Sequence, residues 1–138
     1  MADSTDEKII DLLRENAQEP NTSIAKKVGL SEAAVRKRIL NMQKSGTIKR
    51  FTVELGSKAA ISALCLVAVD SHSPTEKVAA RIEKMRGVRA LYELSGNYDI
   101  AALIEGPTAE TINGVVDEIR NLPHVSGTDT RMVLRKWK

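Results

Sequence analysis

The sequence predicts an α+β protein built from two small domains of different kinds. Residues 6–45 repeat apolar side chains at helical spacing, whereas residues 63–135 mix helical stripes with short runs typical of strands. Apolar residues make up 42% of the 138 residues, which is enough to fill a core and argues against wholesale disorder. Aromatic residues make up only 3%, so Val, Ile, Leu and Ala are expected to build that core.

The first expected helix spans residues 6–16. We expect Thr5 to cap it, because a threonine side chain can accept hydrogen bonds from the first free N–H groups of a helix. Asp6 and Glu7 would complement the positive end of its dipole. The apolar stripe of this helix consists of Ile9, Ile10, Leu12 and Leu13.

Two further helices are separated by a tight corner. One begins at residues 21–23 and ends at Gly29, because glycine tolerates a positive φ at low cost. The other is capped by Ser31 and closes at residues 45–46. Their apolar stripes consist of Ile24, Ala25 and Val28 in the first and of Val35, Ile39 and Met42 in the second. Residues 47–55 then favour extended chain over helix.

The hydrophobic periodicity changes in the second half of the chain, which predicts four strands and two helices. Glycine and proline mark most of the boundaries between them. The expected elements are a buried strand over 63–69, a helix begun by Pro74 and stopped by Gly87, a strand over 89–95, a turn at 96–98, a strand over 99–105, a helix that follows residues 106–108 and ends before Pro123, and a strand over 128–135.

This β-α-β-β-α-β order is the pattern of ferredoxin-like folds, in which two helices pack on one face of a four-stranded antiparallel sheet. The whole chain is therefore expected to be an N-terminal winged-type helix-turn-helix domain followed by a ferredoxin-like domain. We expect the first domain over residues 1–46, an extended linker over residues 47–61 and the second domain over residues 62–138.

Positive charge is concentrated in the first domain. The chain as a whole has a formal net charge of +3. Residues 21–50 alone carry eight basic side chains and the single acid Glu32, whereas residues 51–138 carry eleven of each sign. This asymmetry indicates that one end of the molecule binds a partner with dense negative charge.

A helix, a tight glycine corner and a second helix form the usual reader of double-stranded DNA. The stripe that faces the body would leave the opposite side of the last helix free to enter a major groove, where Arg or Lys can pair with guanine. We expect base contacts from Glu32, Ala33, Arg36 and Lys37, and phosphate contacts from Thr22, Ser31, Lys44, Lys49 and Arg50. Arg38 lies next to the inward stripe and is expected to pack at the edge of the helix.

Three other interpretations remain open from the residues alone. The basic face can be merely solvated, or it can belong to an architectural protein that coats or bends DNA with little base readout. An enzyme or amino-acid-binding module is disfavoured, since His72 and His124 fall in expected loops without a carboxylate or cysteine suitably spaced for metal or nucleophile chemistry. We therefore expect no catalytic set, no metal site and no cofactor, and we interpret Cys65 as a small core residue.

No segment predicts a membrane anchor. The apolar stretch over residues 59–69 is interrupted by Ser62 and is too short to span a bilayer. Asp3, Asp6 and Glu7 stand where a signal peptide would need basic residues. A single cysteine cannot form an internal disulfide, so a cytoplasmic location is expected.

Several segments together resemble the Lrp/AsnC, or feast-famine, family of transcription regulators, and the resemblance covers almost the whole chain. They are DEKIIDLLRENA, SIAKKVGLSEAAVRKRI, KSGTIKRFTVEL, SGNYDIAALIEG and TDTRMVLR. The resemblance implies a DNA-reading domain followed by an effector and oligomerisation domain. It also implies homodimers joined through their sheets, which often assemble into octamers.

Family members bind free amino acids between subunits around a glycine-aspartate turn. The resemblance therefore implies that Gly96, Asn97, Tyr98 and Asp99 contact an amino-acid effector. Asp99 would accept from the α-ammonium group, and turn N–H groups would hold the carboxylate. Thr128 and Thr130 would add hydroxyl contacts, and Tyr92 would line the side-chain end. On the residues alone, the backbone needs of a tight turn are the better explanation of Gly96.

Overall fold

A computed structural model describes residues 3–56 and 60–137. The chain divides into two compact units, Met1–Leu55 and Gly56–Lys138, and each is described by itself. The expected linker over residues 47–61 contains positions 57–59, and the expected domains begin with positions 1–2 and end with position 138. These six positions lie outside the described residues.

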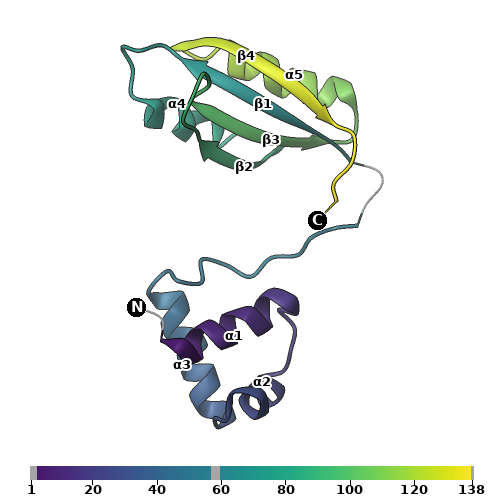
Figure 1. Cartoon of the computed structure of the whole chain (residues 1–138). Helices are drawn as coiled ribbons and strands as arrows, with labels where there is room; N and C mark the ends of the chain where they lie inside the picture. Colours follow the sequence, from purple (N-terminus) through teal and green to yellow (C-terminus); the bar gives the residue numbers. More distant parts are fainter. Residues whose placement is uncertain (1–2, 57–59, 138) are drawn as a thin grey trace. The chain divides into compact units, whose positions relative to one another are not determined.

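The first unit is a bundle of three helices, α1 (Ser4–Glu15), α2 (Asn21–Val28) and α3 (Glu32–Lys44), as Figure 1 shows. Their apolar stripes meet in one core, as the periodicity predicts. That core consists of Ile9, Ile24, Ala25, Val35 and Met42, with Ile10, Leu12, Leu13, Val28, Leu30, Ile39 and Ile48 packed around it.

The cap of α1 differs from the expectation. Asp3, not Thr5, is the N-cap residue, and its carboxylate accepts from the N–H groups of Thr5 and Asp6, each at 2.9 Å. The side chain of Asp6 accepts in return from the N–H of Asp3 at 3.4 Å, which completes a capping box. The cap is therefore an aspartate and not the expected threonine, and the helix begins two residues earlier than predicted.

The corner between α2 and α3 forms as predicted. Gly29 adopts a left-handed conformation with a φ of 72°, and the N–H of Leu30 donates to Ala25 at 3.0 Å. Ser31 caps α3 by accepting from the N–H of Ala34. Beyond α3, residues 49–56 are irregular and pair with no strand, so the described part of this unit contains no β-wing.

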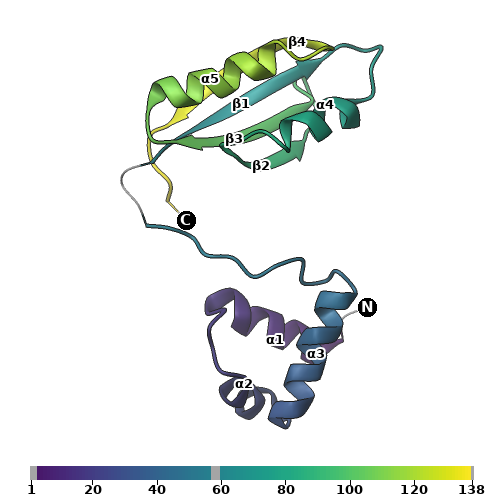
Figure 2. The same ribbon diagram turned by 180° about the vertical axis from the view of Figure 1, so that it is seen from behind.

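The second unit is a four-stranded antiparallel sheet whose strand order is β2-β3-β1-β4. Both helices cover the same face of that sheet, as Figure 2 shows. The order β-α-β-β-α-β and the ferredoxin-like arrangement are confirmed. The elements are β1 (Ile61–Val69), α4 (Thr75–Ile82), β2 (Val88–Glu93), β3 (Ile100–Gly106), α5 (Ala109–Arg120) and β4 (Val125–Val133).

The core of this unit lies between the sheet and the two helices. The four α5 residues predicted to face inward are all buried, and Cys65 is fully buried in β1, as expected. Burial raises the pKa of the Cys65 thiol. The core consists of Ala63, Cys65, Val67, Val78, Ile82, Ile100, Ala102, Ile104, Ile112, Val115, Val116 and Ile119.

The bounds of α4 and the start of β4 differ from the expectation. Pro74 precedes the first residue of α4 as its N-cap, and α4 ends at Ile82 instead of reaching Gly87. β4 begins at Val125, three residues before the expected start. The long β1 explains the second difference, because its ladder with β4 continues past Ala68 to pair Val69 with Val125.

Among the described residues, no helix combines the length and the apolar character that crossing a membrane requires.

Candidate nucleic-acid interface and ligand-binding turn

The outward side of α3 carries the expected base-reading residues. Val35 is fully buried on the inner side of α3. On the other side, Ala33, Arg36 and Lys37 are exposed and Glu32 is half-buried. The helix thus keeps its apolar stripe in the core and turns its polar side outward. The first turn of α3 immediately follows the tight corner, the position from which a recognition helix contacts base edges.

Arg36 is exposed but pairs with Glu32 one helical turn earlier. Its side chain remains 62% exposed. An exposed pair at this spacing stabilises a helix by only about 0.2–0.5 kcal/mol, so the guanidinium can exchange partners readily. Lys37 is exposed and forms no ion pair with any described residue.

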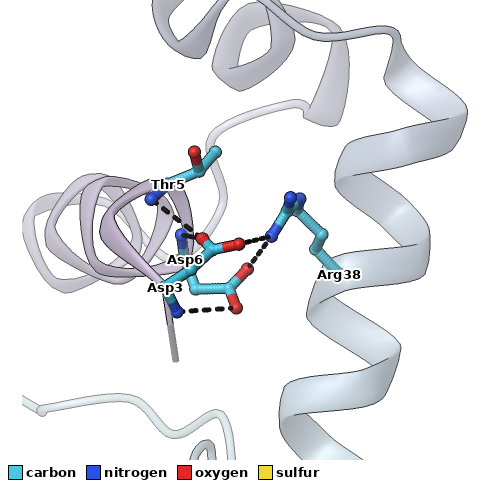
Figure 3. Close-up of polar contacts among 4 residues, drawn as sticks. All are labelled: Asp3, Thr5, Asp6 and Arg38. Atoms are coloured by element: carbon cyan, nitrogen blue, oxygen red, sulfur yellow. Dashed lines mark hydrogen bonds and ion pairs between the residues drawn. The ribbon is translucent and has the colours of Figure 1, made fainter. Parts of the chain in front are cut away.

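Arg38 is half-buried and forms ion pairs within the unit. Its Nη1 atom lies 2.8 Å from Asp3 Oδ2 and 2.8 Å from Asp6 Oδ1, so it ties α3 to the start of α1, as Figure 3 shows. Backbone N–H donation from Asp6, aided by Arg38, holds the pKa of the Asp3 carboxyl below its ordinary value. Arg38 therefore positions the helix, as its place beside the inward stripe indicated.

The sequence count overstates the free positive charge of residues 21–50. Acids outside that window neutralise Arg38, and Lys27 Nζ lies 2.5 Å from Glu19 Oε1. The basic side chains of this window without an ion pair to a described residue are Lys26, Lys37, Lys44, Lys49 and Arg50.

The expected phosphate-contacting residues lie around α3. Thr22 is exposed in the first turn of α2, Ser31 caps α3 and Lys44 ends it. The Ser31 oxygen accepts from the N–H of Ala34, which leaves its hydroxyl proton available to a phosphate. Lys49 and Arg50 are exposed in the chain that follows.

The expected ligand turn lies at the start of β3. Gly96 has a φ of 114°, so the turn does require a glycine, and open space surrounds the position of a Cβ there. Gly96 and Asn97 are exposed, and Tyr98 is half-buried. The Asp99 carboxylate accepts from the N–H of Val69 at 2.7 Å through one oxygen, Oδ2.

The two threonines of β4 share one face, as predicted, but this is the helix-covered face. In the β1–β4 register, Thr128 stands opposite Val67 and Thr130 opposite Cys65, and both partners are buried. Thr128 accepts from Nε of Arg120 at 3.0 Å, and the Thr130 hydroxyl is buried without a hydrogen-bond partner.

Tyr92 lies far from these threonines. It belongs to β2, at the opposite edge of the sheet from β4, about 14 Å away across three strand spacings. Its side chain is 57% exposed. It lies with its register partner Ala101 on the open face of the sheet, the face that neither helix covers. The seven expected effector residues therefore do not converge within one chain.

Two surface cavities lie elsewhere on the second unit. One of about 710 Å³ is bounded by residues 86–89, 105–107 and the side of α5 that carries Gly114, and it contains none of the expected site residues. The other, of about 300 Å³, is lined by Arg120 and residues 125–128, so it includes Thr128 alone. The contact of Arg120 with Thr128 was not predicted from the sequence, because it depends on helix–sheet packing.

The expectation for the histidines needs one correction. His124 Nδ1 lies 3.1 Å from Asp70 Oδ2, so a carboxylate is close to it after all. Asp70 also accepts from the backbone N–H of His72. Within residues 3–56 and 60–137, however, no three acidic, histidine or cysteine side chains are grouped to hold a metal ion.

A helix-turn-helix unit with an outward basic helix, joined to a ferredoxin-like unit, defines a DNA-binding regulator. Comparison with known proteins agrees. Residues 3–43 match the AsnC-type helix-turn-helix domain, and residues 62–138 match the Lrp/AsnC ligand binding domain. The chain belongs to the Lrp/AsnC family of transcription regulators.

The relatives are regulators and not enzymes. The HTH-type transcriptional regulator LysM of Sulfurisphaera tokodaii is 43% identical over 135 residues, which cover 98% of this chain and 96% of LysM. The leucine response regulatory protein of Mycobacterium tuberculosis has the same fold, with a TM-score of 0.87 at 20% identity over 99% of this chain and 95% of that one. A transcriptional regulator of Neisseria meningitidis, solved as a complex with L-Met, has a TM-score of 0.84 at 21% identity, over 100% of this chain and 93% of that one.

Proposed function

We propose that this regulator reads double-stranded DNA with the outward side of α3 lying in the major groove. The observation that carries the proposal is the division of that helix. Val35 and Met42 are buried, whereas Arg36 and Lys37 project to solvent from its first half. Thr22, Ser31, Lys44, Lys49 and Arg50 would hold the DNA backbone, which fixes register without reading sequence.

We further propose that the working form is a homodimer joined through the open face of the sheet. Leu64, Leu66 and Leu103 lie on the face that no helix covers, and they remain only half-buried in the single chain. Phe51, Val53 and Leu55 are also exposed and alternate with other residues along the irregular segment, which would suit pairing with a second copy. An octamer would require contacts beyond this face.

A small amino acid is the proposed effector, bound where turns of different subunits meet. The scattered positions of Tyr92, Asp99 and Thr128 favour a site completed by a second chain. The matched ligand-binding domain supports this assignment, and so does the methionine complex of the Neisseria protein. Assembly would then couple effector binding to the spacing of the DNA readers. We place this activity in the cytoplasm, with the DNA partner.

Binding to random-sequence and selected duplexes would test DNA reading, using fluorescence anisotropy across a range of salt concentrations. Lys44→Ala removes one proposed phosphate-contacting charge, so the magnitude of the slope of log affinity against log salt is expected to fall by about one. Lys77→Ala on α4 removes the same charge from the other unit and should leave the slope unchanged. Equal slopes for both variants would contradict the proposed face.

An architectural protein of the same fold, which coats or bends DNA without an effector, is the second candidate. The same basic face would serve it, but with little contact to base edges. Arg36→Ala distinguishes the two functions. In a sequence-specific regulator it should relax the preference for the selected duplex, whereas in an architectural protein it should weaken binding to all duplexes about equally.

Thermal unfolding in the presence of each of the twenty amino acids would test the effector. A ligand at one hundred times its Kd should stabilise the protein by about 2.7 kcal/mol. Asp99→Asn removes the charge that would bind the α-ammonium group and should abolish that shift, whereas Glu110→Gln on α5 should preserve it. If no amino acid raises the Tm of the unaltered protein, the effector proposal fails.

A further inference from the structure

Three consecutive cations on α3 have three different electrostatic environments. Arg38 is tied to α1, Lys37 is unpaired among the described residues, and Arg36 is paired with Glu32 on its own helix. Glu32 is the only acid in residues 21–50 and is the first residue of α3. The one carboxylate of the basic segment therefore lies within the proposed reading surface.

A carboxylate at this place is costly for any protein that binds only the DNA backbone. A phosphate approaching the first turn of α3 would be repelled by Glu32, although the helix dipole itself favours anions there. The same carboxylate can be favourable in the major groove, where it can accept from an exocyclic amino group such as that of cytosine. Glu32 would thus disfavour contact with the phosphate backbone and favour contact with base edges, whereas the positive charge of Lys37 would favour both.

The ion pair also restricts what Arg36 can do. A guanidinium has five N–H donors arranged as a planar fork, and Glu32 contacts one terminal nitrogen, Nη2. The remaining donors can still form a bidentate pair with a guanine edge. A partner one turn away disfavours rotation of the side chain toward a neighbouring phosphate, so the pair biases Arg36 toward the base edges while remaining exchangeable.

We propose that Glu32 is a specificity-determining residue, which orients Arg36 toward guanine and repels α3 from the phosphate backbone. The inference rests on the proposed DNA-reading function and adds the mechanism by which non-specific binding is kept weak. Without Glu32, Arg36 would be free to bind the phosphates of DNA of any sequence. The carboxylate therefore increases discrimination at the expense of total affinity.

Glu32→Gln tests this mechanism, because it removes the charge and keeps the size of the side chain. The preferred duplex is first selected from a random library with the unaltered protein, and affinities for it and for a scrambled duplex are then measured. Glu32→Gln should bind the scrambled duplex more tightly and with a salt slope steeper by about one. The ratio of the two affinities should fall by roughly 2-fold or more, because the variant loses the orienting pair and also the repulsion of phosphates.

Two further variants separate positioning from general electrostatics. Glu15→Gln removes the same charge from the end of α1 and should leave the affinity ratio unchanged. Arg36→Lys keeps the positive charge but loses the fork, so the ratio should fall while the salt slope for the scrambled duplex does not decrease.

The outcomes distinguish this inference from the function it rests on. If the unaltered protein shows no preference for any duplex, sequence-specific reading itself is wrong. If it has a preference that Glu32→Gln retains in full, or if that variant loses affinity for both duplexes equally, the role assigned to Glu32 is overturned. Circular dichroism of the variant confirms that α3 remains folded in either case.

Discussion

At the residue scale, long-range partners decide which charges on α3 are free. Arg38 bonds to acids 32 and 35 positions earlier in the chain. No local spacing rule encodes such a pairing, so the sequence indicated only that Arg38 lies at the helix edge. Glu32 and Arg36 are four positions apart, and that pair was available from helical spacing alone.

The Asp3–Arg38 contact gives stability a defined dependence on pH. The pKa of Asp3 in the folded state lies below its ordinary value of 3.8, first because of the backbone N–H of Asp6 and next because of Arg38. A group with a depressed folded pKa stabilises the protein fully above its unfolded pKa and loses this contribution as the pH falls through the folded value.

At pH 7 the Asp3→Asn variant should therefore have a lower Tm than the unaltered protein. The difference in Tm should shrink as the pH falls below about 3.8 and disappear once Asp3 is protonated in both states. Thermal unfolding followed by circular dichroism at several pH values measures it. Asp11→Asn, on the same helix, supplies the matched control. A Tm difference that stays constant down to the lowest pH would contradict this account.

At the element scale, helix stripes and caps were predictable, whereas ends fixed by tertiary packing were not. The inward residues of α3 and α5 followed from periodicity, and Gly29 and Ser31 followed from their chemistry. The end of α4 and the face of Thr128 depend on packing and on the β1–β4 register, which the sequence does not reveal.

Two glycine-to-alanine substitutions should have opposite effects on stability. Gly29→Ala forces a left-handed conformation on alanine and should destabilise the first unit by about 1–2 kcal/mol. Gly114→Ala places a methyl group into open space within α5 and should stabilise the second unit by about 0.5–1 kcal/mol. Urea unfolding of both variants measures the difference, and effects of the same sign would be inconsistent with the backbone conformations described.

At the scale of the whole molecule, the fold class was predictable, whereas the relative positions of the expected effector residues were not. Turn residues 96–99 lie together as expected, yet Tyr92 and Thr128 lie at opposite edges of the sheet and on different faces. Sequence order cannot reveal this separation, because strand order and register are set by long-range pairing. A second chain is the simplest way to bring such residues around one ligand.

Disrupting the open sheet face should dissociate the proposed dimer. Leu103→Asp places a charge opposite Leu64 on that face, and an uncompensated buried charge costs about 3–5 kcal/mol. The proposed dimer should therefore dissociate at concentrations roughly two to four orders of magnitude higher, as measured by light scattering coupled to gel filtration. Ala80→Asp on the outer side of α4 should leave the mass unchanged. If Leu103→Asp keeps the same mass at every concentration, the sheet face is not the interface.

Methylation interference is the most direct measurement of the central claim that α3 reads base edges in the major groove. Methyl groups on guanine N7 lie in that groove and should block binding at specific positions in two half-sites, about 10 base pairs apart or a multiple of that distance. Interference from adenine N3 methylation in the minor groove, with none from guanine N7, would contradict the account.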